Sequence, residues 1–371
     1  MRKLCLFLFS CIILIANNHS AFGVTAYPFA IEITQPDGSK IMIIPKGDEH
    51  LKWAQTVDGY SIMHNSKGIY EYTKLSPKMD MVPSGVRAKN VPERSNSDIL
   101  FLNNTPKGIV YSKSQVGMMK SISRMYQKYT LKAFPTSGSR KLICILIGFT
   151  DKAFTKTKAD FENLFNQVGY SADGATGSVF DYYKENSYNQ LNLAVTVAGP
   201  FTAAHNMAYY GANDASGSDV NPEALVTEAV TLADPSVNYA DFDNDNNGTV
   251  DGVFVVHAGY GEEAGASSNT IWAHTSSIPP LTLDGKTVSD YACSSELRGV
   301  SGTGLTRIGV ICHEFGHILG TMDFYDTNFT TNGSYDGTGD WDIMGDGSWN
   351  NNGTTPAHHN PYSKIIVYGW A

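Results

Sequence analysis

Two histidines and one glutamate stand at a spacing that suits metal chemistry. His313, Glu314 and His317 form the pattern His-Glu-x-x-His. On a helix, residues four apart lie on one face, so both imidazoles can bind a single Zn²⁺. Glu314 is too close in sequence to add a good third bond, and it can instead hold and deprotonate a zinc-bound water. The pattern predicts a helical zinc site with its own general base.

The residues that follow the second histidine offer a third ligand. Gly320 comes three residues after His317, and Asp323 comes three residues after Gly320. Glycine can take the left-handed conformation that ends a helix and reverses the chain, so Asp323 can swing back to the metal and leave the fourth position to water. No glutamate follows Glu314 in the sequence, so a glutamate from a later helix cannot serve. The other downstream candidates fit the glycine turn less well: Asp326, Asp336, Asp340, Asp342, Asp346, His358 and His359.

A second candidate metal site is an acidic loop. Its oxygen-bearing side chains stand at loop positions 1, 3, 5 and 9, which are Asp243, Asp245, Asn247 and Asp251. Gly248 occupies position 6, as in most Ca²⁺ loops of the EF-hand type. Phe254 replaces the closing acid at position 12, and a strand is expected next, so a helix–loop–helix unit is not predicted. We predict a structural Ca²⁺ loop, with Asp241 as a further ligand candidate; the alternative is a polar turn without metal.

The histidines outside the zinc pattern carry less weight. His257 ends a predicted strand, and His274 follows Trp272-Ala273. A histidine on a strand more often packs in a core or supports a site than binds a metal.

The elements that must position these residues follow from hydrophobic periodicity and turn residues. A hairpin is predicted over 31–45 around the turn 36–38, with more short strands to about residue 75 and a loop or linker over 76–108. A helix is predicted over 115–134, with Met118, Ile122, Met125 and Tyr126 on one side. Helices are further predicted over 158–168, 179–186, 222–233 and 304–319, and strands over 141–149, 191–197 and 252–257. In 222–233 the inward residues are expected to be Leu225, Ala229 and Leu232.

The start of the chain has the features of a signal peptide. Arg2 and Lys3 precede an apolar run over 4–16, and small residues at Ala21 and Gly23 suit a cleavage site. We predict a signal peptide over 1–23, a mature chain that starts near Val24, and a secreted or cell-surface protein. The apolar run is too short to span a bilayer well, so stable membrane insertion is not expected.

Charge divides the rest of the chain into two parts, with a boundary near Pro135. Residues 24–137 hold 15 Lys/Arg against 9 Asp/Glu, a net charge of +6, whereas residues 138–371 hold 10 against 27, a net charge of −17. The acidic excess argues against nucleic-acid binding and is compatible with calcium and cationic ligands. Arg140-Lys141 beside the boundary is a candidate processing site.

Cysteines are few after the leader. Cys144, Cys293 and Cys312 are an odd and sparse set, so no disulfide scaffold is predicted, and a single Cys144–Cys293 bond stays open.

Several segments resemble a known family. Residues 313–326 (HEFGHILGTMDFYD) are similar to the zinc signature of M6-family metallopeptidases, the immune inhibitor A-like group of the metzincin clan. Residues 341–345 resemble its Met-turn, in which Met344 would lie beneath the zinc ligands. Residues 177–188 and 364–370 also resemble family segments, and the likeness spans roughly 140–370. Most metzincins have histidine as third ligand, but aspartate at position 323 agrees with this family.

The resemblance implies an α+β fold. We expect a metzincin-like catalytic domain over 138–371, with a twisted mixed sheet, an active-site helix and a smaller C-terminal subdomain, preceded by a β-rich pro-domain over 24–137. The implied function is a secreted zinc endopeptidase that acts on protein or peptide substrates, is made as a zymogen and is inhibited by its own pro-domain. The alternative is a non-catalytic binding module with a structural zinc.

The pro-domain contains no cysteine, so a thiolate cannot block the zinc. Latency is therefore expected from steric cover of the cleft, with an Asp or Glu carboxylate as the group that replaces the zinc water.

Overall fold

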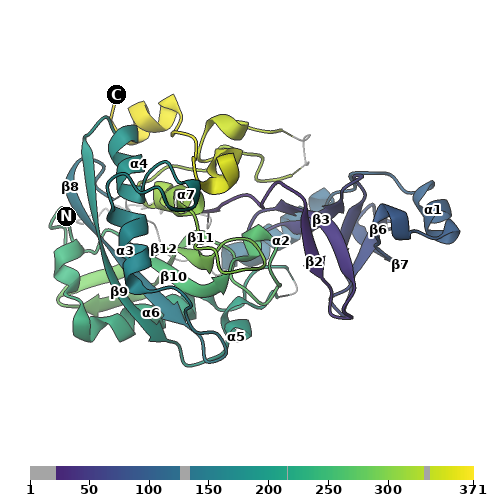
Figure 1. Ribbon diagram of the computed structural model, residues 1–371, viewed down its shortest axis with the longest axis horizontal. Helices are drawn as coiled ribbons and strands as arrows, with labels where there is room; N and C mark the ends of the chain where they lie inside the picture. Colours follow the sequence, from purple (N-terminus) through teal and green to yellow (C-terminus); the bar gives the residue numbers. More distant parts are fainter. Residues whose placement is uncertain (1–21, 126–133, 215, 330–334) are drawn as a thin grey trace, which may run out of the picture.

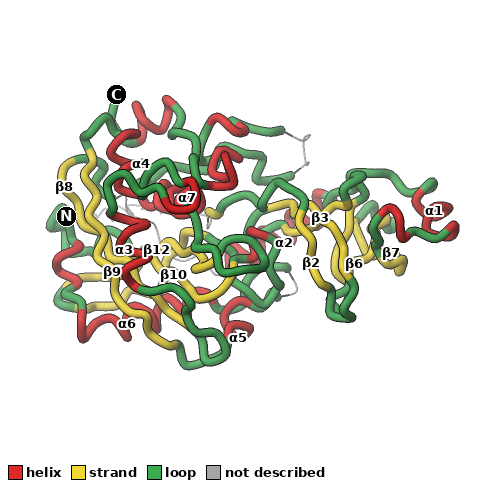
Figure 2. The backbone as a smooth tube through the Cα atoms, viewed as in Figure 1, coloured by secondary structure: helices red, strands yellow, loops and turns green. Residues whose placement is uncertain are grey.

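The chain is organised by two six-stranded β-sheets in the computed structural model, which describes residues 22–371 except 126–133, 215 and 330–334. The predicted signal peptide therefore lies almost wholly outside the described residues. The N-terminal sheet projects from the side of a larger body, which holds the second sheet and most of the helices (Figure 1). Figure 2 shows the same division by secondary structure.

The N-terminal sheet is an antiparallel meander in chain order. Its strands are β2 (Ile31–Thr34), β3 (Lys40–Gly47), β4 (Lys52–Thr56), β5 (Ser61–His64), β6 (Tyr70–Leu75) and β7 (Met81–Arg87). The predicted first hairpin is confirmed, with Ile31 opposite Ile43 and Ile33 opposite Ile41. One face of the sheet buries an apolar cluster that includes Ile41 and Ile43.

The loop predicted over 76–108 is wrong. Besides β7, this stretch contains helix α1 (Asn96–Leu102), and α2 (Lys113–Met125) follows it. Ser95 and Asp98 form a reciprocal capping box that starts α1. Helix α2 covers part of the helix predicted over 115–134; residues 126–133 of that range lie outside the described residues, and Phe134 is not helical. Met118, expected on the apolar side of that helix, is 56% exposed.

The second sheet is mixed and has the order β1-β11-β12-β10-β8-β9. Strands β9, β8, β10 and β12 pair in parallel, whereas β11 pairs antiparallel with β12 and with the edge strand β1. The bounds are β1 (Phe22–Gly23), β8 (Gly138–Gly148), β9 (Leu191–Thr202), β10 (Val253–Tyr260), β11 (His274–Leu283) and β12 (Lys286–Leu297). The strands predicted over 141–149, 191–197 and 252–257 are confirmed, whereas the β11–β12 hairpin was not predicted.

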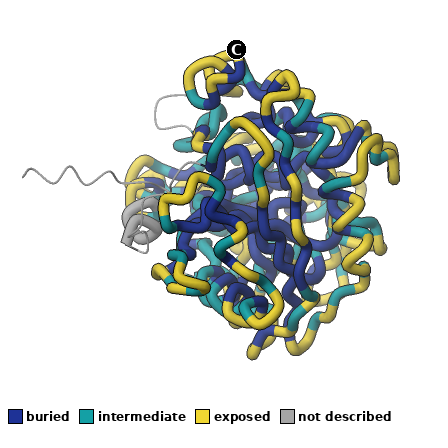
Figure 3. Tube along the Cα trace, turned by 90° about the vertical axis from the view of Figure 1, so that its left-hand side faces the viewer, coloured by how far each residue is buried: buried dark blue, intermediate teal, exposed yellow. Residues whose placement is uncertain are grey.

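Helices pack on both faces of this sheet because alternate residues of its strands point to opposite sides. Leu142, Cys144 and Leu146 of β8 join the cluster that holds α3 (Lys158–Asn166), α4 (Val179–Asn186) and α7 (Ile308–Ile318). The other face holds α6 (Pro222–Ala233), and α5 (Met207–Gly211) contacts α6. Figure 3 shows the buried residues concentrated in the interior of the molecule. The mixed sheet agrees with the prediction, but this part is a helix–sheet–helix α/β sandwich rather than a segregated α+β arrangement.

Most predicted helices of this part are present. Helices α4 and α6 have the predicted bounds, and α7 begins four residues later than predicted, at Ile308. Leu232, predicted to point inward from α6, is 41% exposed. The prediction is wrong because the buried stripe of α6 runs through Val226, Val230 and Ala233 as well as Leu225 and Ala229, which leaves position 232 at its margin.

The cysteines are buried and free. Cys144 and Cys293 belong to the apolar clusters on opposite faces of the sheet, so they cannot form the disulfide that the sequence left open.

Two further observations bear on processing and on membranes. Arg140 and Lys141 lie inside β8, paired with Leu193 and Ala194 of β9, so a protease could reach their peptide bond only by opening the sheet, which disfavours that processing site. No helix among the described residues has the length and apolar character to cross a bilayer.

Candidate metal centre and its cleft

Helix α7 carries the His-Glu-x-x-His residues between the sheet and the C-terminal segment. All of its residues are buried, because the sheet packs on one side and the turn over 346–353 packs on the other. The helix ends at Ile318, and Gly320 has φ +99°, the left-handed value that a residue with a Cβ avoids. The chain reverses there and brings Asp323 back toward the histidines.

His313, His317 and Asp323 form one compact cluster of ligand atoms. The two Nε2 atoms are 3.2 Å apart, and Asp323 Oδ1 lies 3.2 Å from Nε2 of His313 and 3.3 Å from that of His317. Zinc–ligand bonds of about 2.0–2.1 Å at tetrahedral angles would separate the ligand atoms by roughly 3.4 Å. The three distances therefore fit one tetrahedral zinc.

The histidine tautomers also fit a cation. Nδ1 of His313 lies 2.7 Å from the carbonyl oxygen of Ile343, and Nδ1 of His317 lies 3.0 Å from that of Thr321. A carbonyl only accepts, so both Nδ1 atoms donate, and neutral rings turn their Nε2 lone pairs toward each other and Asp323. Burial alone lowers the pKa of His313, but the Asp323 hydrogen bond and the Glu314 charge raise this pKa to about 9. Both features mean that the cluster attracts positive charge.

Met344 lies directly beneath the helix. It is fully buried, and a Cβ added at Gly316 would lie 2.8 Å from its sulfur. The Met344 carbonyl accepts a hydrogen bond from Phe324 N, next to Asp323. The turn at Met344 thus supports both α7 and the segment that carries the third candidate ligand.

Glu314 has one carboxylate oxygen held by the sheet and one turned to the cleft. Thr275 Oγ1 on β11 donates to Oε2 at 3.0 Å, and the backbone N–H of Val24 donates to Oε1 at 2.9 Å. Burial raises the pKa of Glu314 to about 8, with His313 lowering it and Asp323 raising it further. A carboxylate with a raised pKa next to an N–H group is suited to accept and return a proton.

Tyr325 is a site residue that the sequence analysis missed. Its hydroxyl donates to the carbonyl oxygen of Gly23 at 2.6 Å. The same peptide group, Gly23–Val24, presents its nitrogen to Glu314. A phenol on the carbonyl side and a carboxylate on the nitrogen side therefore hold one peptide bond. Only the position of Tyr325, two residues after Asp323, could have suggested this role, and tyrosines are too common for that to be specific.

The N-terminal segment runs through the cleft as an extended chain. Phe22 and Gly23 form the edge strand β1 and pair antiparallel with Thr275 and His274 of β11. Trp272 Nε1 then donates to the Val24 carbonyl, and Trp349 Nε1 donates to the Thr25 carbonyl, both at 2.9 Å. Edge-strand pairing and buried N–H donors to carbonyls are how a site binds an extended peptide.

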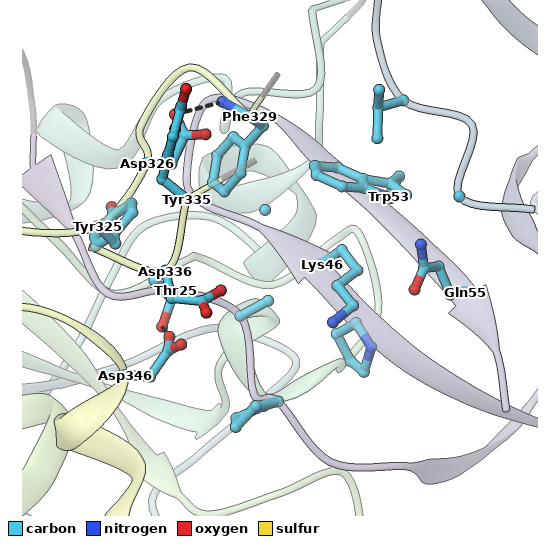
Figure 4. Close-up of a pocket in the computed structure, with 16 residues that line it drawn as sticks. Thr25, Lys46, Trp53, Gln55, Tyr325, Asp326, Phe329, Tyr335, Asp336 and Asp346 are labelled. Atoms are coloured by element: carbon cyan, nitrogen blue, oxygen red, sulfur yellow. Dashed lines mark hydrogen bonds between the residues drawn. The ribbon is translucent and has the colours of Figure 1, made fainter. Parts of the chain in front are cut away.

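A cavity of about 450 Å³ opens beside this segment. Figure 4 shows it between Lys46 and Trp53 of the N-terminal sheet on one side and Tyr325 on the other. Thr25 Oγ1 donates to Asp346 at 2.9 Å on its floor. The cavity therefore lies between the two parts of the chain, at the mouth of the cleft.

The other downstream candidates do not join the zinc cluster. Asp326 accepts hydrogen bonds from the backbone N–H groups of Asn328 and Phe329, and exposed His358 contacts Glu185. His359 is buried beside Gly316, on the Met344 side.

The two upstream histidines are buried as well. His274 bonds to Tyr291 and to the Trp272 carbonyl, and His257 Nδ1 lies near the Ala258 carbonyl. Both thus take part in packing of the sheet.

The acidic loop gathers three of its predicted ligands. Asp243, Asp245 and Asp251 place a carboxylate oxygen each within 4.8 Å of one another. Asn247 instead donates through Nδ2 to Asp245, at 2.9 Å. Lys286 Nζ lies 2.7 Å from Asp243 Oδ2 and neutralises part of the charge. As the prediction requires, strand β10 follows the loop, so it is not part of an EF-hand helix pair.

The spacing, ligand cluster and supporting methionine are those of a metallopeptidase. The family model described as immune inhibitor A peptidase M6, catalytic domain, matches residues 136–367, and the chain belongs to this family.

Two curated relatives are also similar to this chain. Pre-pro-metalloprotease PrtV of Vibrio cholerae serotype O1 (strain M66-2) is 31% identical over 244 residues, which cover 55% of this chain and 25% of the relative. Immune inhibitor A of Bacillus thuringiensis subsp. alesti is 29% identical over 233 residues, 54% of this chain and 34% of the relative. The aligned region thus spans about a quarter to a third of these relatives. The crystal structure of metalloproteinase-II from Bacteroides fragilis aligns over 92% of this chain and 85% of its own, but at 13% identity and a TM-score of 0.29, too low to define a shared fold.

Proposed function

We propose that this chain is a secreted, zinc-dependent endopeptidase made as a zymogen. The observation that carries the proposal is the placement, in the chain that still carries its leader, of the Gly23–Val24 peptide bond across the candidate catalytic residues. The Val24 nitrogen lies 2.9 Å from Glu314 Oε1, and the Gly23 oxygen lies 2.6 Å from Tyr325 Oη. A substrate bond held in the same way would have its leaving nitrogen on the base and its carbonyl oxygen on a donor.

The chemistry follows from these contacts. Bound by His313, His317 and Asp323, zinc would supply an activated water and polarise the carbonyl. Glu314 accepts the proton of the attacking water, whose oxygen bonds to the carbonyl carbon. Tyr325 donates to the carbonyl oxygen as negative charge develops there. The carbon–nitrogen bond then breaks, and Glu314 returns its proton to the leaving amine.

The direct test is metal-dependent cleavage of a large, unstructured protein such as casein. The full chain, loaded with zinc and activated by limited proteolysis where needed, should cleave casein, lose this activity with a zinc chelator and regain it with added Zn²⁺. Zinc binding without cleavage under all these conditions would favour the alternative, a binding module with a structural metal.

Latency is the second part of the proposal, and its support lies in the occupied cleft. In a mature chain that starts near Val24, residues 24–27 would still lie along the cleft, with the Val24 nitrogen at Glu314 and the carbonyls of residues 24 and 25 at Trp272 and Trp349. The N-terminal part also brings a carboxylate to the site. Glu49 is buried, and its Oε2 has no hydrogen-bond partner. This oxygen lies close to the backbone of Gly23, because a Cβ added to that glycine would be only 2.6 Å from it. Burial raises the pKa of Glu49, and the charges of Asp48, Asp323 and Glu314 raise it further. Glu49 is therefore our candidate for the blocking carboxylate.

Latency predicts that the uncut chain is inactive on large substrates and that cleavage between the two parts releases activity. The opposite net charges of residues 24–137 (+6) and 138–371 (−17) should help to hold the two parts together before cleavage. The attraction between exposed charges should weaken as salt is added, because charges more than about 10 Å apart are screened at ordinary ionic strength. Full activity of the uncut chain on casein would rule out the zymogen but leave the zinc site unaffected.

We further propose that the acidic loop binds Ca²⁺. Three clustered carboxylates repel one another, and burial raises the pKa of Asp251, as do the charges of Asp245 and Asp243. Oxygen ligands of this kind suit a hard cation. The alternative, a polar turn without metal, is supported by the ion pair between Lys286 and Asp243, which already neutralises one of the three carboxylates.

A further inference from the structure

A lysine of the N-terminal sheet is buried in an acidic pocket of the C-terminal part. Lys52 starts β4, and only 11% of its side chain is exposed. Its Nζ lies 3.3 Å from Asp219 Oδ1 and 3.1 Å from Asn213 Oδ1, and it also contacts Glu262 Oε2. The ammonium lies over the ring of Trp272, 5.1 Å from its centroid. Two carboxylates, one amide and one aromatic face thus surround a single cation.

The C-terminal part holds this pocket in shape through its own contacts. Asn213 Nδ2 donates to Glu262 Oε1 at 2.7 Å, and the backbone N–H of Trp272 donates to Asp219 Oδ2 at 2.9 Å. Each carboxylate therefore has one oxygen fixed from within and one turned to the ammonium. Burial would lower the pKa of Lys52, but Asp219 and Glu262 outweigh it and raise this pKa, so the lysine is charged.

The pocket adjoins the peptide cleft through a shared wall. Trp272 faces the Lys52 ammonium with its ring and donates from Nε1 to the carbonyl oxygen of Val24. Val24 is the residue whose nitrogen meets Glu314. Three residues further along the segment, Tyr27 N donates to the carbonyl oxygen of Glu263, which adjoins Glu262 in the sequence. The acidic pocket thus lies beside the residues that follow the peptide bond held at Glu314.

We propose that Asp219, Glu262, Asn213 and Trp272 form a substrate subsite for a lysine or arginine side chain, which Lys52 fills in the uncut chain. The proposal rests on the proposed peptidase function and gives its cleft a preference. The substrate side chain would come from one of the first residues after the cleaved bond.

Room for such a side chain is present at the interface. A cavity of about 540 Å³ adjoins Lys52 and is lined on the C-terminal side by Glu262, Trp272 and Asn213. Release of the N-terminal part would remove Lys52 and open the pocket, which leaves two carboxylates without their cation. A basic side chain that binds there would restore the ion pairs and the contact with the Trp272 ring, and so gain affinity.

The first test is the cleavage pattern of the zinc-loaded, activated full chain on a mixed peptide pool, read by mass spectrometry. Wild type should cut bonds with Lys or Arg among the first four residues after the cleaved bond about tenfold more often than matched bonds with norleucine or Gln there, as expected for one partly buried charge pair. This ratio should fall toward one in the double variant Asp219→Asn, Glu262→Gln. Glu185→Gln removes an exposed acid of the same domain and should keep the ratio.

Three results would be informative in different ways. No preference in wild type, or a preference that survives in the double variant, would overturn the subsite. If wild type cleaves no peptide at all, the peptidase function itself fails, and the subsite fails with it.

A second test does not depend on activity and uses the uncut chain. Lys52→Ala deletes the carbon chain and ammonium of the lysine, so n-propylammonium should enter the pocket and stabilise the variant. Because only the native state binds, the Tm of Lys52→Ala should rise by about 2–4 °C at saturating amine, with no such rise for wild type. The neutral n-propanol is the matched control. An equal response to amine in both proteins would mean that the pocket does not accept a free basic group.

Discussion

Asp323→Ala should reduce zinc affinity by at least about 100-fold. Asp323 Oδ1 lies 3.2 and 3.3 Å from the two histidine Nε2 atoms and is the only negative member of that cluster. Loss of a residue that merely supports a metal ligand already costs about 10–100-fold in affinity. Loss of a charged ligand should cost more, so we take about 2.7 kcal/mol, the equivalent of 100-fold, as the lower bound.

The assay is competition for zinc against a chromophoric chelator, with Asp326→Ala as the matched control. Asp326 is three residues away and carries the same charge, but its Oδ1 accepts hydrogen bonds from Asn328 and Phe329 N–H groups instead of facing the histidines. The control should stay within a few-fold of wild type. Equal zinc retention in the two variants would refute the assignment of Asp323 and turn attention to Asp336, His358 or His359.

Three other outcomes are expected. Calcium should raise the Tm of the intact protein, and Asp245→Ala should abolish that rise. A Tm of wild type that does not change with calcium would mean that the loop is a polar turn that binds no metal. Tyr325→Phe should lower kcat by about 10²-fold with little change in KM and in zinc content, as for loss of one oxyanion donor, and an unchanged kcat would refute its role. The hydrogen bonds from Arg94 lower the pKa of Asp58 to about 2 in the folded protein. The stability that this pair contributes should be complete above about pH 4, near the pKa of Asp58 in the unfolded chain, and should be lost as pH falls toward 2. Urea unfolding at pH 5 and pH 3 should show that loss in wild type and much less of it in Asp58→Asn.

The zinc cluster was predictable because its geometry is local. His313 and His317 share one helix face, and a single glycine turn connects them to Asp323. Spacing along the chain therefore determines the arrangement in space. The helices α4 and α6 were predictable for a related reason, since each has a clear apolar stripe with residues suited to its start, such as Ser178 and Pro222.

The cleft was not predictable, because its parts meet only in three dimensions. Val24 and Glu314 are 290 positions apart, and Lys52 and Glu262 are 210 apart. No periodicity or motif relates such pairs. The acidic balance of 138–371 indicated cationic partners but could not locate them.

The missed hairpin β11–β12 has a different cause. Its turn, Asp284-Gly285, has both residues at positive φ, a conformation that Asp-Gly favours, so a local signal was present. The strands on either side are rich in Ser, Thr and Pro, with little apolar alternation, and this weakened the strand signal. Burial at the centre of the sheet, not propensity, makes β12 a strand.

The most direct test of the central claim is to compare Glu314→Ala with wild type for zinc content and casein cleavage. Glu314 is not among the clustered ligand atoms, so the variant should bind one zinc per chain as wild type does. It should lose peptide-bond cleavage, because the substitution removes the carboxylate that is assigned to move the proton between water and leaving amine. Zinc retained with activity lost would support a zinc endopeptidase with Glu314 as its base. Appreciable turnover by the zinc-loaded variant would contradict it.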